Sequence, residues 1–185
     1  MRNIFSIIGI IVILILTGCV SQRVSTIVGC NYDQKNNRTD YFEFPYGTIS
    51  IPGNWEKTRY NPVSNQQFFS NHDSISIAIA FSRFDKYEFN TNGDHKGYDF
   101  VKAFYEWETE YFFDMFGFNT KVLVNDSIHK FILFQNYGQF EGATFNTYFL
   151  FGEKNGNVSN FSVMTTDKWS EDEKVEFLKG LYLKD

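Results

Sequence analysis

Residues 121–166 read KVLVNDSIHKFILFQNYGQFEGATFNTYFLFGEKNGNVSNFSVMTT and hold the clearest structural pattern of the chain. Apolar and aromatic residues recur there in runs separated by turn-forming residues, which is typical of β-strands. The predicted strands are 121–125, 128–137, 143–153 and 157–166. Asn155-Gly156 is a preferred dipeptide of two-residue type I′ turns, so we expect the last two strands to be antiparallel neighbours. Gly138 to Gly142 predicts a similar hairpin between the preceding two.

Both faces of the strand predicted at 128–137 carry apolar side chains. Ile132 and Phe134 fall on one face, and Phe131, Leu133 and Tyr137 fall on the other. A strand of this kind needs cover on both sides. We therefore expect one helix on each face of the sheet.

The first helix is predicted over residues 99–116, with Asp99 as N-cap and Gly117 as a left-handed stop. Its apolar stripe consists of Phe100, Phe104, Trp107, Tyr111 and Met115. The stripe packs against the sheet or forms one wall of an apolar ligand cavity. Glu108 projects into the apolar arc, and we expect it at the rim with a hydrated carboxylate, since burying an unpaired charge is costly. The second helix begins at the capping box Ser170-Glu171-Asp172-Glu173 and runs to the C-terminus.

The N-terminal half adds a hairpin and a further strand. Strands 41–44 and 48–51 flank the turn Pro45-Tyr46-Gly47. In the strand predicted at 74–83, Ile75, Ile77, Ile79 and Phe81 share one face, while small residues on the other let a helix approach closely. The predicted fold class is α+β: a single, mainly antiparallel twisted β-sheet with helices packed on its faces.

Residues 1–19 carry a targeting pattern. A cation at Arg2 precedes the apolar run from Ile4 to Leu16, which is too short to span a bilayer comfortably and suits a secretory signal. Leu16-Thr17-Gly18-Cys19 resembles the lipobox of bacterial lipoproteins. This resemblance implies cleavage between Gly18 and Cys19 and acylation of Cys19, for instance with palmitate. It also implies attachment to the membrane of the cell envelope, facing away from the cytoplasm, and to the outer membrane if the host has two.

The predicted organisation is a lipoprotein signal peptide at 1–18, a lipidated N-terminus and flexible tether at 19–40, and one globular domain at 41–185. The tether follows from a composition rich in Ser, Gln, Asn and Thr. Val24 to Val28 remains a candidate edge strand. If Cys19 is acylated, Cys30 is the remaining thiol, and it either pairs between molecules or packs as a free thiol.

The order of elements from Thr48-Ile49-Ser50-Ile51-Pro52-Gly53-Asn54-Trp55 to the closing helix resembles the PsbP-like fold, over residues 41–185. That fold occurs in a lumenal subunit of plant photosystem II, in a nuclear-import factor that binds the Ran GTPase and in many bacterial lipoproteins. The resemblance implies binding to other proteins. It transfers no partner and no binding residue.

Composition excludes some functions. The net charge of −5 and the lack of a basic stripe argue against nucleic acid as a partner. His72, His95 and His129 form no zinc or triad motif, so we predict no catalytic residue, no metal and no cofactor. Asn90 to Asp94 has oxygen side chains at alternate positions, but His95 and Val101 stand where a calcium loop needs its glycine and its bidentate glutamate.

The chain has an unusual aromatic content of 22 Phe, 11 Tyr and 3 Trp, and most of these rings must lie in the core. Phe113 and Phe116 fall near the polar side of the predicted helix, and Phe68, Phe69 and Phe84 lie near strand ends. We take these five as candidate exposed contact aromatics.

The favoured function is a membrane-anchored, non-catalytic binding or assembly module for a protein partner in the cell envelope. The alternatives are a carrier of a small apolar ligand, held in a cavity between sheet and helix, and an enzyme without a recognised motif.

Overall fold

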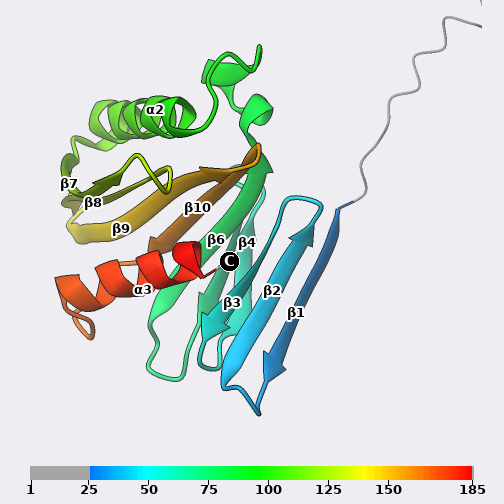
Figure 1. The fold of residues 1–185 in the computed structure, drawn as a ribbon. Helices are drawn as coiled ribbons and strands as arrows, with labels where there is room; N and C mark the ends of the chain where they lie inside the picture. Colours follow the sequence, from blue (N-terminus) through cyan, green and yellow to red (C-terminus); the bar gives the residue numbers. More distant parts are fainter. Residues whose placement is uncertain (1–25, 185) are drawn as a thin grey trace, which may run out of the picture.

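The computed structural model describes residues 26–184 (Figure 1). These residues form two antiparallel sheets, two short 3₁₀ turns and two α-helices. The small sheet has the order β1-β2-β3, made of β1 (Ile27–Asp33), β2 (Arg38–Phe44) and β3 (Gly47–Pro52). The α+β class predicted from the sequence is confirmed.

The large sheet has the order β4-β5-β6-β10-β9-β8-β7. Its strands are β4 (Glu56–Asn61), β5 (Gln66–Ser70), β6 (Ser76–Arg83), β7 (Asn119–Asp126), β8 (Phe131–Phe140), β9 (Ala143–Lys154) and β10 (Asn157–Val163). The predicted neighbours β9 and β10 pair antiparallel around Asn155-Gly156, and β8 pairs with β9 around Glu141-Gly142. The meander predicted from residues 121–166 is therefore confirmed.

Both faces of the large sheet are covered, as the strand pattern predicts. Helix α2 (Tyr98–Phe116) lies over β8 and β9 on one face, where Phe134 and Phe151 belong to its core. Helix α3 (Glu171–Leu183) and the small sheet cover the other face, where Leu133 and Leu150 are buried (Figure 1). The protein thus has one core on each side of the same sheet.

The small sheet corrects two predictions. The predicted hairpin is present as β2 and β3, but with β1 it forms a sheet of its own instead of joining a single sheet. The predicted flexible tether 19–40 is wrong for residues 27–40, because β1 pairs with β2 from Ile27 to Asp33. Local composition did not reveal this pairing, since most of the partner strand, Tyr41 to Phe44, lies outside the polar segment.

The helix boundaries follow the predicted signals in part. Gly117 has a left-handed φ of 68° and ends α2, while Gly97 and not Asp99 is the N-cap. The capping box of α3 is formed by Ser170 and Glu173. One packing expectation is wrong: α2 lies over β8 and β9, and not on the small-residue face of β6. The large rings of β8 and β9 offer that helix more apolar surface than Ala78 and Ala80.

Candidate functional site

The apolar stripe of α2 is buried only in its first half. Phe100 and Phe104 are buried, whereas Trp107, Tyr111 and Met115 are 36%, 48% and 59% exposed. Exposure of the stripe thus increases toward the C-terminal end of the helix. The prediction that the whole stripe packs against the sheet is wrong for these last three residues.

Other rings of α2 take their place in the core. Phe112 lies 5.8 Å from Phe149 of β9, measured between ring centroids. Phe116 lies 5.3 Å from Phe118 and 5.0 Å from Phe140. The buried side of the helix therefore turns toward Phe112 and Phe116, and the Trp107–Met115 edge is left in solvent.

A row of carboxylates runs beside the exposed edge. Glu106, Glu110 and Asp114 are all exposed and repeat at the same four-residue spacing as Trp107, Tyr111 and Met115. Residues four apart stack along one side of a helix, so the two rows are parallel neighbours. We name these six residues the α2 surface. It combines an apolar stripe with negative charge.

The apolar arc of α2 is wider than the predicted stripe. This width is a signal in the sequence for an exposed apolar surface on the helix. From Trp107 through Tyr111 and Met115 to Phe112 and Phe116, the apolar residues span about 180° of the helix, at 100° per residue. A helix on a sheet buries a stripe of roughly 100°. Part of so wide an arc must stay exposed, but only the tertiary structure shows which part.

The five candidate contact aromatics have different environments. Phe113 is 64% exposed, and Phe116 and Phe84 are partly buried. Phe68 and Phe69 are buried inside β5, so the expectation that they are exposed is wrong. Phe69 packs edge-on against Tyr41 of the small sheet, and the Arg59 guanidinium covers Phe68. The small sheet and β4, which the sequence pattern did not place here, provide this cover.

The structure does not bring these five rings together into one site. Phe84 contacts Phe100 at the beginning of α2, whereas Phe116 contacts Phe140 at its end. Phe113 lies on the far side of the carboxylate row from Tyr111, by the helical angle between them. Only Phe113 and Phe116 are therefore on the same part of the fold as the α2 surface.

Glu108 lies on the side of α2 toward the sheet and does not belong to the exposed carboxylate row. Its side chain is partly buried, and removal from water raises the pKa of its carboxyl to about 7. Its charge in turn helps to raise the pKa of Tyr87, after burial of that ring. Partial exposure of Glu108 agrees with the predicted rim position. The expectation that its carboxylate is hydrated is wrong, because Phe104 and Phe112, one turn before and after it, pack in or against the aromatic core.

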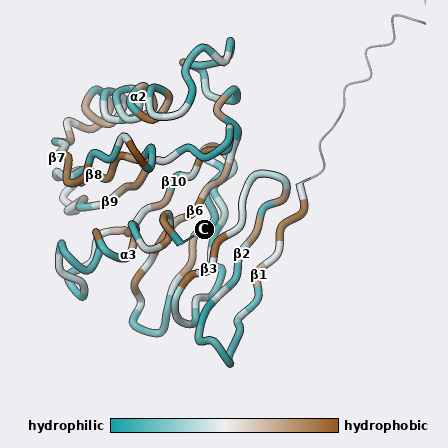
Figure 2. Tube along the Cα trace, viewed as in Figure 1, coloured by the Kyte–Doolittle hydropathy of each residue, from teal (hydrophilic) through white to brown (hydrophobic). Residues whose placement is uncertain are grey.

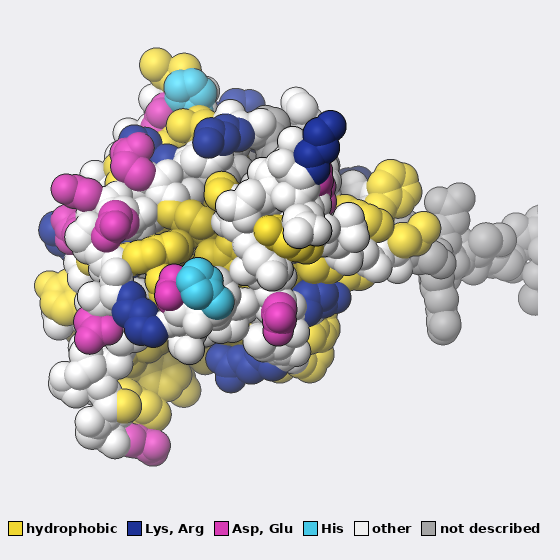
Figure 3. All heavy atoms as spheres, turned by 90° about the horizontal axis from the view of Figure 1, so that it is seen from below, with side chains coloured by type: hydrophobic (Ala, Val, Ile, Leu, Met, Phe, Trp, Pro, Cys, Tyr) yellow, Lys and Arg dark blue, Asp and Glu magenta, His cyan; other side chains and the backbone are white. Residues whose placement is uncertain are grey.

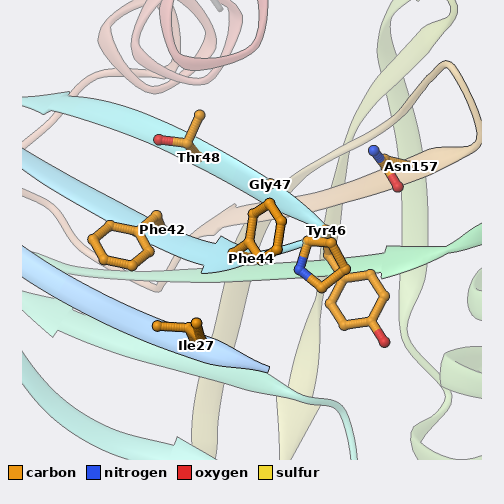
Figure 4. A pocket seen from close by; sticks show the side chains of 8 residues that line it. Ile27, Phe42, Phe44, Tyr46, Gly47, Thr48 and Asn157 are labelled. Atoms are coloured by element: carbon orange, nitrogen blue, oxygen red, sulfur yellow. The ribbon is translucent and has the colours of Figure 1, made fainter. Parts of the chain in front are cut away.

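Phe104 of α2 stacks directly on Phe151 of β9, with ring centroids 4.0 Å apart. The ligand-carrier alternative requires a cavity between helix and sheet, and at this position the two rings fill that space. A hollow is present elsewhere, beside β2 and β3. It has a volume of about 480 Å³ and is lined by Ile27, Phe42, Phe44, Pro45, Tyr46, Gly47, Thr48 and Asn157 (Figure 4).

Residues 26–184 contain no group of three His, Cys, Asp or Glu side chains that could hold a metal ion. No helix among them is both long and apolar enough to cross a membrane. The predicted cleavage and lipidation positions, Gly18 and Cys19, lie outside the described residues.

Cys30 is a free and exposed thiol on β1. Partial burial raises its pKa, and the nearby Lys57 ammonium opposes that effect. Of the two possibilities that the sequence left open, a fully packed thiol is therefore excluded. Pairing between molecules remains a prediction.

Comparison with known proteins gives two solved structures with a distant likeness. No protein-family model matches the chain, and no curated protein matches it. A protein from Bacteroides thetaiotaomicron VPI-5482 is 10% identical over 68% of this chain, with a TM-score of 0.41. The matched region is only 40% of the Bacteroides chain.

The second structure is the cyanobacterial PsbP (CyanoP) from Synechocystis sp. PCC 6803. It is 13% identical, covers 89% of this chain and 94% of its own, and has a TM-score of 0.37. Identities of 10% and 13% transfer no site residue to this chain. The α+β class is therefore taken from its own strands and helices.

Proposed function

We propose that this protein is an exported, membrane-anchored lipoprotein that acts as a non-catalytic binding module for a protein partner in the cell envelope. The observation that carries the binding role is the α2 surface. Trp107, Tyr111 and Met115 form a continuous exposed apolar stripe, and aromatic residues and Met are enriched at protein interfaces. The proposed anchor is an acylated Cys19, which the lipobox supports.

The carboxylate row indicates the chemistry of the partner. Glu106, Glu110 and Asp114 flank the apolar stripe along its whole length. A partner that buries the stripe must bring its own surface close to these three charges. We therefore propose an envelope protein with an apolar patch that is bordered by Lys or Arg, because complementary charge speeds association and excludes wrong partners.

Photo-crosslinking in the native host tests the binding role. A benzophenone amino acid replaces Tyr111 in one variant and Lys102 in a control variant, since Lys102 is exposed on the opposite side of α2. We expect one envelope protein to crosslink from position 111 and not from position 102. Equal crosslinking from the two positions contradicts the proposal.

Affinity measurement with the purified partner then tests the α2 surface itself. Met115→Ala and Trp107→Ala should each weaken binding at least about tenfold, or 1.4 kcal/mol. Lys102→Ala serves as the matched control and should leave the affinity unchanged. Binding should also weaken as salt screens the carboxylate row. Unchanged affinity in both apolar variants contradicts the proposed site.

Replacement of Cys19 tests the anchor separately. The unmodified chain should incorporate labelled palmitate and sediment with membranes, because two or more acyl chains hold a protein stably at a bilayer. Cys19→Ser should lose both properties, while Cys30→Ser should retain both. Palmitate incorporation by Cys19→Ser, or none by the unmodified chain, contradicts lipidation at this residue.

A further inference from the structure

The small sheet has an apolar end and a polar end. On the outer face of the sheet, Ile27 of β1 is paired with Phe44 of β2. Two residues further along β1, Gly29 is paired with Phe42. Asn31 and Asp40 come next, followed by Asp33 and Arg38. The sheet thus changes from apolar to charged along the direction of β1, as its colours show (Figure 2).

The side chains at the apolar end are exposed. Ile27 is 60% exposed and Phe44 is 64% exposed, and together with Pro45 they line the hollow beside β2 and β3 (Figure 4). Hydrophobic side chains are visible at the surface where the described chain begins (Figure 3). The apolar end of the sheet is therefore the end from which the chain leads back to its N-terminus.

The packing of Phe42 shows how this end is built. The ring of Phe42 lies across Gly29 of the neighbouring strand, where an added Cβ would come within 2.2 Å of the ring. Glycine at this position lets the ring lie flat on β1. Phe42 remains partly exposed, so an apolar surface continues from Phe44 across β1.

The proposed anchor lies only eight residues before β1, at Cys19. A segment of that length spans at most about 28 Å when fully extended and about 16 Å on average when flexible. The apolar end of the small sheet is thus held near the bilayer surface, whereas the charged end at Asp33 and Arg38 points away along β1.

We infer that the apolar end of the small sheet, formed by Ile27, Phe42, Phe44 and Pro45, docks on the surface of the lipid bilayer and sets the orientation of the domain. This inference rests on the proposed membrane anchoring. The lipid surface covers the hollow at this apolar end, because the short segment between Cys19 and β1 holds the apolar end near the bilayer. Aromatic and aliphatic side chains gain free energy when they enter the interface between headgroups and acyl chains.

Fluorescence of the full lipidated protein in phosphatidylcholine vesicles tests the inference. In the Cys30→Ser background, Phe44→Cys carries an environment-sensitive fluorophore, and Gln34→Cys at the opposite end of β1 is the matched control. Acylated Cys19 does not react with the label. Phosphatidylcholine is chosen because it has no net charge, so that the response reports apolar contact.

We expect the label at position 44 to shift to shorter wavelength on addition of vesicles, and nitroxide-bearing lipids to quench it at least about twofold more than the label at position 34. Equal quenching at both positions in a protein that floats with the vesicles overturns the inference and leaves the anchor intact. A protein that does not float contradicts the proposed anchoring instead. A label at position 44 that is already blue-shifted in the Cys19→Ser background, without vesicles or detergent, shows that a second copy or the N-terminal segment fills the hollow, and it also overturns the inference.

Discussion

The ring of Phe104 on α2 lies nearly parallel to the ring of Phe151 on β9, with an interplanar angle of 8°. Both side chains are fully or almost fully buried. This contact joins the helix that carries the α2 surface to β9 of the large sheet. The position of the exposed stripe depends on it, because Trp107 and Tyr111 follow on the next two turns.

Phe104→Ala should lower the free energy of unfolding by about 3 to 5 kcal/mol, through lost burial and the cavity that remains. Urea denaturation followed by circular dichroism measures the change. Phe113→Ala removes a ring from the exposed side of the same helix and should change the stability by less than about 0.5 kcal/mol. Equal effects of the two substitutions contradict the packing described for α2.

Glu108 should make the protein less stable as the pH rises. Its pKa of about 7 in the folded state lies above its ordinary value of 4.5, so the folded state retains the proton more firmly than the unfolded state. The stabilisation is complete at acidic pH and is lost between about pH 4.5 and pH 7.

Glu108→Gln should therefore be more stable than the unmodified protein at pH 8, by about 3 kcal/mol, and nearly equal to it at pH 4. Denaturation at a series of pH values gives the comparison. Glu110→Gln removes the same charge from an exposed site on the same helix and serves as the control. If the free energies of unfolding of Glu108→Gln and of the unmodified protein change with pH in parallel, the Glu108 carboxylate is not desolvated in the folded state.

Ser170→Ala should destabilise the protein by about 1 kcal/mol, because the backbone N–H of Glu173 donates to the Ser170 hydroxyl at the start of α3. In return, the Ser170 N–H donates to the Glu173 carboxylate at 2.7 Å, and this bond lowers the pKa of Glu173. Thermal unfolding measures the loss, with the exposed Ser127→Ala as control. No difference between the two variants argues against the capping box.

Cys30 should react with maleimides in the folded protein, since its thiol is exposed. At neutral pH the reaction should be slower than that of cysteine in an unstructured peptide, because burial raises the thiol pKa. Lys57→Ala should slow it further, since the Lys57 ammonium favours the thiolate. Mass spectrometry of timed samples gives the rates, and Cys30→Ser should take up no label at this position. A faster reaction in Lys57→Ala contradicts this account.

The sequence alone determined the features that depend on neighbouring residues. Asn155-Gly156 predicted the β9–β10 hairpin, Gly117 the end of α2 and the Ser170–Glu173 box the beginning of α3. Turn geometry and helix caps involve contacts over a few residues, so their signals are written in short segments. The lipobox is a signal of the same kind, and it remains a prediction about residues outside the described part.

Only the tertiary structure decided which apolar residues are exposed. The periodicity of α2 could not show that Phe112 and Phe116 turn toward β8 and β9 and leave Tyr111 and Met115 in solvent. Nor could composition show that residues 27–33 pair with β2 and shorten the tether. Burial depends on how far each element extends over its neighbours, and strand pairing depends on a partner elsewhere in the chain. Both are properties of the assembled fold and not of any single segment.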